Sequence, residues 1–150
     1  MQDNKGKDVN EFVEIGCNQE IDVTGYKIIL INGADGLPYK IVHLSGICSP
    51  SGDQFIFEKV RLQNGPDGIA ILDPKDRVIE FITYEGFFKV VYNGIFLRPN
   101  VLEVSEARDT KKGLSIQKTG SGCQGRDFEW KSEPTQSSPG KVNVGQTISC

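Results

Sequence analysis

The sequence has few of the side chains on which most catalytic and metal sites depend. It contains one His, one Met and one Trp among 150 residues, and its four Cys residues show no CxxC spacing. Because His43 is the single imidazole, a structural zinc site would have few ligands to draw on. A Ser or Cys nucleophile would have only His43 as a histidine base. Glu11 with Glu14, and Glu80 with Glu85, are candidate acid/base pairs, but spacing alone does not make them converge on a pocket. We therefore expect no enzyme activity and identify no small-molecule substrate.

Long apolar runs and an excess of positive charge are also missing. No stretch approaches the roughly 18 apolar residues that cross a bilayer, so we expect no membrane span. Residues 1–10 are polar and lack the apolar centre of a signal peptide, which favours a cytosolic chain or a processed piece. The formal net charge of −3 and the pI near 5.2 give no global attraction to phosphate backbones, so nucleic acid is not an expected partner.

The four cysteines bear on whether the chain is cytosolic or a processed piece of a secreted protein. Among the three pairings that they allow, we favour Cys17–Cys48 and Cys123–Cys150, because each pair is nearest in sequence and each member lies beside a turn or a chain end. Four free buried thiols in a cytosolic protein are the alternative. Disulfides are typical of secreted chains, so the preferred pairing predicts a secreted or extracytoplasmic protein.

Seventeen glycines and seven prolines favour short strands and many turns, and residues 64–86 carry the clearest example. A turn signal at 65–68 leads into an apolar segment at 69–72, and a second turn signal at 73–76 leads into another at 78–84. This order predicts a β-hairpin. Both faces of the return strand are apolar, so we expect a sheet that is covered on each side. Strict alternation would place Val78, Glu80, Ile82 and Tyr84 on one face, and Ile79, Phe81 and Thr83 on the other.

The same reading applied along the chain predicts an all-β sandwich of roughly eight or nine strands, with a closed barrel as the alternative. We expect one domain over residues 1–150, with a polar N-terminal loop at 1–10 and an extended C-terminal tail at 132–150. A glycine-rich turn is expected at 119–126, and a short helix near 102–108. In the strand expected at 113–118, Leu114 and Ile116 should point inward, against Ser115 and Gln117. The remaining strands are expected at 11–15, 26–31, 39–44, 54–60, 87–91 and 127–131.

Seven short motifs, in order, resemble the lamin tail domain in the form carried by secreted bacterial proteins, including some extracellular nucleases. The resemblance covers residues 11–146 and implies an immunoglobulin-like β-sandwich that serves as a binding or accessory module without catalysis of its own. Only Asp3-Asn4 corresponds to the end of the strand that usually precedes EFVEI, so we expect that first strand to be shortened or missing. The motifs are EFVEI (11–15), VTGY (23–26), LQNGPDGIAILD (62–73), VIEFITYEG (78–86), GLSIQKTGSG (113–122), DFEW (127–130) and SPGKVNVGQ (138–146).

Two local groups are candidate sites. Asp3, Asp8 and Glu11 gather oxygen donors around a glycine-containing loop, which predicts a Ca²⁺ site, the alternative being a flexible polar N-terminus. The aromatic residues Tyr84, Phe87, Phe88, Tyr92 and Phe96 are expected mainly in the core. If exposed, Phe87 and Phe88, with Tyr92, would mark an interaction patch.

We therefore expect a secreted, non-catalytic module that binds other proteins or extracellular surfaces, or that assembles with itself. One alternative is an accessory substrate-binding domain of an extracellular nuclease or other hydrolase. Another is a structural subunit of an extracellular filament, formed by strand exchange at the shortened N-terminal edge.

Overall fold

The computed structural model describes residues 11–50, 55–101 and 113–150, and its regular elements are short strands. Besides these strands, the described part contains one 3-10 helix, η1 (Gly125–Asp127). The all-β prediction is confirmed. The helix expected near residues 102–108 lies outside the described residues. Where the structure describes the chain, it holds no helix long and apolar enough to cross a membrane.

The described residues fall into two compact units, each assembled from separate stretches of chain. The chain passes from one unit to the other after Asp22, Ser45 and Leu62, and again between residues 101 and 113. The prediction of one domain over residues 1–150 stays a prediction. Unit 1 contains residues 11–22, 46–50, 55–62 and 113–150, and unit 2 contains residues 23–45 and 63–101.

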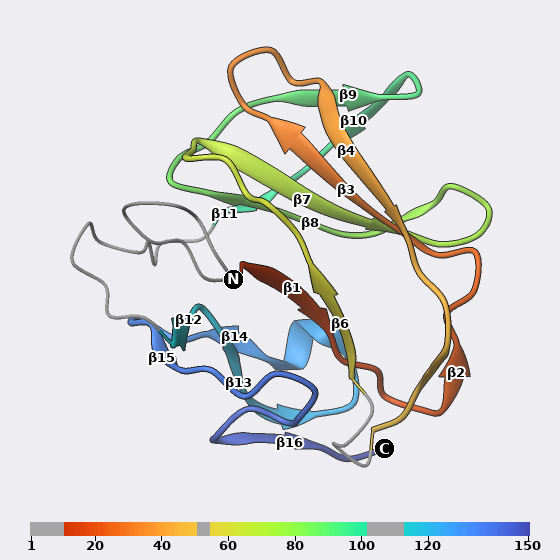
Figure 1. Cartoon of the computed structure of the whole chain (residues 1–150), viewed down its shortest axis with the longest axis vertical. Helices are drawn as coiled ribbons and strands as arrows, with labels where there is room; N and C mark the ends of the chain where they lie inside the picture. The colour runs from red at the N-terminus through yellow and green to blue at the C-terminus, as the bar shows by residue number, and fades with distance from the viewer. Residues whose placement is uncertain (1–10, 51–54, 102–112) are drawn as a thin grey trace. The chain divides into compact units, whose positions relative to one another are not determined.

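Unit 2 is organised around a five-stranded sheet in the order β11-β8-β7-β3-β4 (Figure 1). All neighbours are antiparallel except β11 and β8, which are parallel. The hairpin predicted at 64–86 is confirmed, since β7 and β8 are joined by a turn in which Asp73 accepts three hydrogen bonds from Lys75 and Arg77. The strands are β3 (Lys27–Asn32), β4 (Pro38–His43), β7 (Asp67–Leu72), β8 (Val78–Tyr84) and β11 (Asn100–Val101).

β3, an inner strand of this sheet, is buried on both faces, in line with the expectation of a sheet that is covered on each side. Ile28 and Leu30 point to one face and Ile29 and Ile31 to the other, and all four side chains are inaccessible to solvent. Apolar burial on this scale is the main favourable contribution to folding. These side chains therefore form the centre of the apolar core of unit 2.

A β-bulge changes the faces that strict alternation predicts for β8. The pairing shifts so that Leu72 lies opposite Val78 while Ile71 lies opposite Glu80, which leaves Ile79 as the extra residue. Val78 therefore packs against the cluster that contains Phe81, and the prediction that it shares a face with Glu80 is wrong. Ile79 is 58% exposed.

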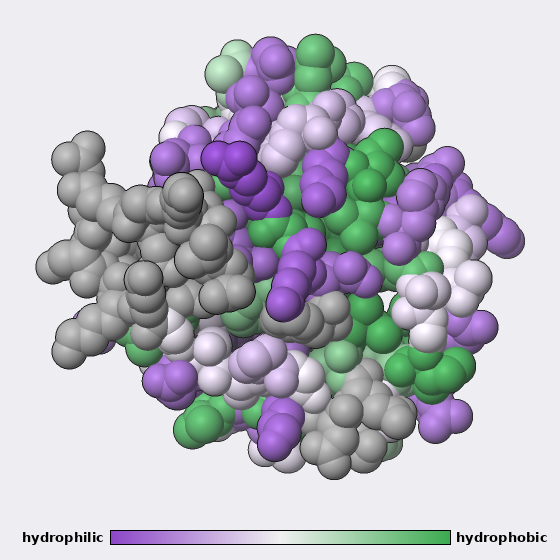
Figure 2. Space-filling model, in the orientation of Figure 1, coloured by the Kyte–Doolittle hydropathy of each residue, from purple (hydrophilic) through white to green (hydrophobic). Residues whose placement is uncertain are grey.

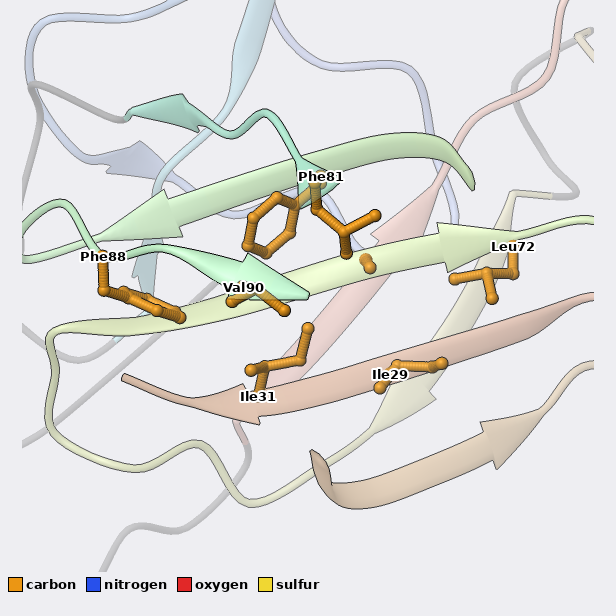
Figure 3. Close-up of a cluster of buried hydrophobic side chains, with 8 residues drawn as sticks. Ile29, Ile31, Leu72, Phe81, Phe88 and Val90 are labelled. Atoms are coloured by element: carbon orange, nitrogen blue, oxygen red, sulfur yellow. The ribbon is translucent and has the colours of Figure 1, made fainter. Parts of the chain in front are cut away.

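A second hairpin lies against one face of this sheet and consists of β9 (Val90–Tyr92) and β10 (Ile95–Leu97). Its two-residue turn, Asn93-Gly94, has positive φ at both positions, 48° and 78°, as a type I′ turn requires. Val90 and Leu97 lie opposite each other and pack into the core cluster. Figure 3 shows Phe81, Phe88 and Val90 gathered over Ile29 and Ile31 of β3; Ala70, Leu72 and Leu97 complete the cluster.

Unit 1 contains four small sheets (Figure 1). The tail expected at 132–150 contributes the short strands β15 and β16, and the turn predicted at 119–126 is a strand as far as Gly122. Sheet hydrogen bonds outweigh the weak local strand preference of these polar, glycine-rich residues. The pairs are β1 (Phe12–Ile15) with β6 (Ile56–Lys59), β2 (Ile21–Asp22) with β5 (Ile47–Cys48), β12 (Leu114–Ser115) with β15 (Thr135–Gln136), and β13 (Lys118–Gly122) with both β14 (Glu129–Trp130) and β16 (Gln146–Ile148).

Two polar side chains that were expected to face solvent are buried in unit 1. Ser115 and Gln117 are 2% and 4% exposed. The Gln117 amide donates to Ser115 Oγ at 2.9 Å and to the Gln136 carbonyl at 2.8 Å, and it accepts from Thr135 Oγ1 at 3.1 Å. Burial is tolerated because these polar atoms are paired.

Candidate interaction surface

Both predicted disulfides are present, and no cysteine is free. Cys17–Cys48 joins the segment after β1 to β5, with Cα atoms 6.2 Å apart. Cys123–Cys150 joins the residue after β13 to the segment after β16, with Cα atoms 5.0 Å apart. Both bridges lie within unit 1, and the alternative of four free thiols is wrong.

The predicted calcium ligands are described only in part. Asp3 and Asp8 lie outside the described residues. Glu11 is buried, and its Oε2 accepts a hydrogen bond from the Leu62 amide at 2.7 Å. Over residues 11–50, 55–101 and 113–150, no three His, Cys, Asp or Glu side chains are placed to hold a metal ion. This contact of Glu11 is structural, because it links the start of β1 to the segment after β6.

Two of the other candidate acids also hold loops through backbone amides. Glu14 accepts from Gly140, and Glu85 accepts from Gly65 at 2.7 Å. Burial raises the pKa of Glu14, and the hydrogen bond from Gly140 opposes that rise. Such contacts are typical of acids that stabilise turns. His43, the remaining candidate base, is exposed at the end of β4.

An exposed apolar surface in unit 2 is the strongest candidate for a function. From Phe87 to Tyr92, exposed and inward-facing residues alternate, so that Phe87, Lys89 and Val91 are exposed while Phe88 and Val90 are buried. On β10 and the residue after it, the same alternation buries Leu97 and exposes Phe96 and Arg98. We call the exposed side, formed by Phe87, Lys89, Val91, Phe96 and Arg98, the outer face.

The centre of the outer face is a cross-strand apolar pair. Val91 and Phe96 lie directly opposite each other, and they are 65% and 47% exposed. Directly opposed residues on one face have Cβ atoms about 4.5–5.5 Å apart, so the two side chains form one continuous apolar surface. Because Val90 and Leu97 anchor the inner side of the same hairpin in the core, this surface is held in place by packing.

Other exposed apolar side chains in unit 2 lack such a partner in the sheet register. Leu37 is in the loop before β4, Ile41 is on β4 opposite the buried Ile29, and Ile79 is at the bulge. Single exposed apolar residues are ordinary on soluble proteins. Figure 2 shows apolar atoms at the end where Figure 1 draws β4, β9 and β10.

Of the three residues in the interaction patch that the sequence suggests, only one belongs to the outer face. Phe87 belongs to it, at 58% exposed, but Phe88 is 9% exposed and makes an edge contact with Phe81, the ring centroids being 6.3 Å apart. Tyr92 is half-buried and packs against the core cluster. The core expectation is confirmed for Phe88, which is therefore not part of a surface.

Sequence reasoning missed Lys89, Val91 and Arg98 because it expected a strand at 87–91 but none at 92–101, so the first strand had no partner to form a hairpin with. The signal was present: Asn93-Gly94 between alternating apolar residues is the strongest short-range indication of a hairpin. Placing the turn there gives the register, and the register gives the outward positions.

Comparisons of the chain with protein-family models, with curated proteins and with solved structures gave no match. The resemblance to the lamin tail domain, and the immunoglobulin-like arrangement that it implies, therefore stay predictions, and the geometry of the outer face has to carry the functional argument.

Proposed function

We propose that this chain is a secreted, non-catalytic binding module of the lamin-tail type, with an immunoglobulin-like β-sandwich fold, and that it attaches to other proteins through the outer face. The observation that carries the proposal is the exposed pair Val91 and Phe96 on a hairpin whose inner side is packed in the core. Contiguous exposed apolar surface on a soluble domain commonly marks an interaction site.

The two disulfides support the extracytoplasmic part of the proposal. Stable disulfides form in oxidising compartments and are rare in the cytosol. The acids that sequence reasoning paired for catalysis support the non-catalytic part only in that Glu11, Glu14 and Glu85 each hold a backbone amide.

Self-assembly through a sheet edge is a second candidate, since β4 is an edge strand of the five-stranded sheet and exposes Ile41. Its first residue is Pro38, and Lys40 is exposed on it. Proline and lysine are devices by which natural edge strands resist pairing with another chain. We therefore favour binding through the outer face over strand exchange at β4.

The test compares capture of proteins from the secreted fraction of the producing organism by three oxidised, immobilised chains. These are the wild type, the double variant Val91→Ser with Phe96→Ser, and Ile79→Ser as a matched control that removes an equally exposed apolar residue of unit 2. We expect specific partners to bind the wild type and the control and to be lost from the double variant. Equal capture by all three chains, or no capture by any, would refute the proposal.

A further inference from the structure

The outer face carries two cations beside its apolar pair. Lys89 and Arg98 are exposed; Lys89 immediately precedes β9 and Arg98 immediately follows β10, at the end of the hairpin away from its turn. Continuing the register places them opposite each other and on the same side as Val91 and Phe96, because side chains alternate across a strand. Neither forms a salt bridge with another residue in the part of the chain that the structure describes.

The spacing between the two pairs sets the partner's geometry. Residues two apart on a strand are about 6.5–7 Å apart along it, so the cationic pair lies that far from the apolar pair. An extended segment of another chain has the same repeat on one of its faces. A carboxylate at one position and an apolar side chain two residues further along would meet both pairs at once.

A second copy of this chain does not fit the same surface. If two outer faces met in the same direction, Lys89 and Arg98 of one copy would oppose those of the other, and like charges in contact are unfavourable. If they met in opposite directions, the cations would be buried against Val91 and Phe96 and would lose their hydration without gaining an opposite charge.

We propose that the outer face receives an extended segment of a different protein in which a carboxylate precedes or follows an apolar side chain by two residues. Lys89 and Arg98 hold the carboxylate, and Val91 and Phe96 contact the apolar side chain. The proposal rests on the proposed binding function and specifies its partner. Charge complementarity of this kind fixes orientation and speeds association more than it adds affinity.

The experiment measures binding of two fluorescein-labelled peptides by fluorescence anisotropy. The acidic peptide has the sequence Thr-Asp-Thr-Phe-Thr-Asp-Thr-Val. In the basic peptide, Lys replaces both Asp residues. The acidic peptide should bind the wild type at least tenfold more tightly than the basic one. Raising the salt concentration from 0.05 to 0.5 M should weaken its binding, because salt screens exposed charges.

Three variants, each checked for an unchanged circular dichroism spectrum and melting temperature, locate the site. Lys89→Glu with Arg98→Glu should reverse the preference between the peptides, and Val91→Ser with Phe96→Ser should weaken both. Lys40→Glu, an exposed cation of β4, is the matched control and should change neither.

The outcomes separate this inference from the proposed function. Binding of the acidic peptide that survives the Lys89 and Arg98 reversal, or that matches the basic peptide, would overturn the inference. If protein capture is still lost in the Val91 and Phe96 variant, the binding function stands while its acidic partner is rejected. Dimerisation of the wild type that the same variant abolishes, measured by sedimentation, would also overturn the inference.

Discussion

Gly68 lies where two aromatic rings of the unit 2 core leave no room for a side chain. A Cβ atom there would be 2.7 Å from Phe81 Cε2 and 3.0 Å from Phe88 Cζ. Both rings are fixed in the core cluster, so neither can move without disturbing its neighbours. At the scale of single residues, Gly68 is required because the packing leaves no space for a side chain, and not because its backbone conformation needs glycine.

Replacing Gly68 with Ala should therefore lower the free energy of unfolding by about 1–3 kcal/mol, the usual cost of overpacking. Urea denaturation followed by fluorescence would measure it. Phe88→Leu shortens one of the opposing side chains. The double variant Gly68→Ala with Phe88→Leu should therefore lose less free energy of unfolding than the sum of the two single losses. Purely additive losses would show that the two positions do not touch.

The half-buried carboxyl of Glu14 should make the stability of the fold depend on pH. Burial raises its pKa, so the folded state binds a proton more readily there than the unfolded chain does. Below the ordinary glutamate pKa of about 4.3, the carboxyl is protonated in both states and carries no penalty. As the pH rises through the raised pKa, the folded protein must hold a half-buried charge and loses stability.

The variant Glu14→Gln keeps an acceptor for the Gly140 amide but never ionises. We expect it to match the wild type at pH 4 and to be more stable at pH 7, by less than about 1 kcal/mol because Glu14 is only half-buried and solvent screens it. Thermal unfolding across this pH range gives the comparison. A stability difference that grows toward low pH would contradict the assignment.

At the scale of elements, the β9–β10 hairpin depends on its turn. Gly94 has φ of 78°, and a Cβ there would meet no atom within 4 Å, so a substitution costs only backbone strain. Gly94→Ala should destabilise the hairpin by about 1 kcal/mol, and Gly94→Asn by less, because Asn tolerates the left-handed region. Hydrogen exchange of the Val90 to Leu97 amides should report faster opening in the Ala variant, and equal rates in both variants would contradict this.

The elements also show where sequence reasoning succeeds. Residues 65–84 combine turn residues with apolar segments of strand length, and the β7–β8 hairpin follows directly. The bulge at Ile79 does not follow, because alternation fixes the period of a strand but not an inserted residue. The burial of Gln117 could not be predicted from the local sequence either, since its partners Thr135 and Gln136 are 18 and 19 residues away.

At the scale of the whole molecule, the two disulfides close loops with sequence separations of 31 and 27 residues. In the chain-entropy account, which is one of two current explanations, each bridge of this size contributes about 3 kcal/mol. Replacing both cysteines of either pair with Ser should lower the free energy of unfolding by about that amount. Denaturation of both double variants measures this, and a loss below about 1 kcal/mol would show that the unfolded chain gains little freedom.

The pairing was predictable at this scale because each cysteine pairs with its nearest neighbour in sequence, which gives the shortest loops. The division into two units was not, because each unit draws on stretches of chain separated by the other. The outer face was predictable in principle, since its register follows from the Asn93-Gly94 turn.

The Cys17–Cys48 bridge encloses the whole stretch 23–45 that forms β3 and β4. A protease that cuts once in the connection between those strands, at residues 33–37, would leave two fragments that remain covalently linked. On a gel without reductant the nicked chain should migrate as a single species, and with reductant it should separate into two.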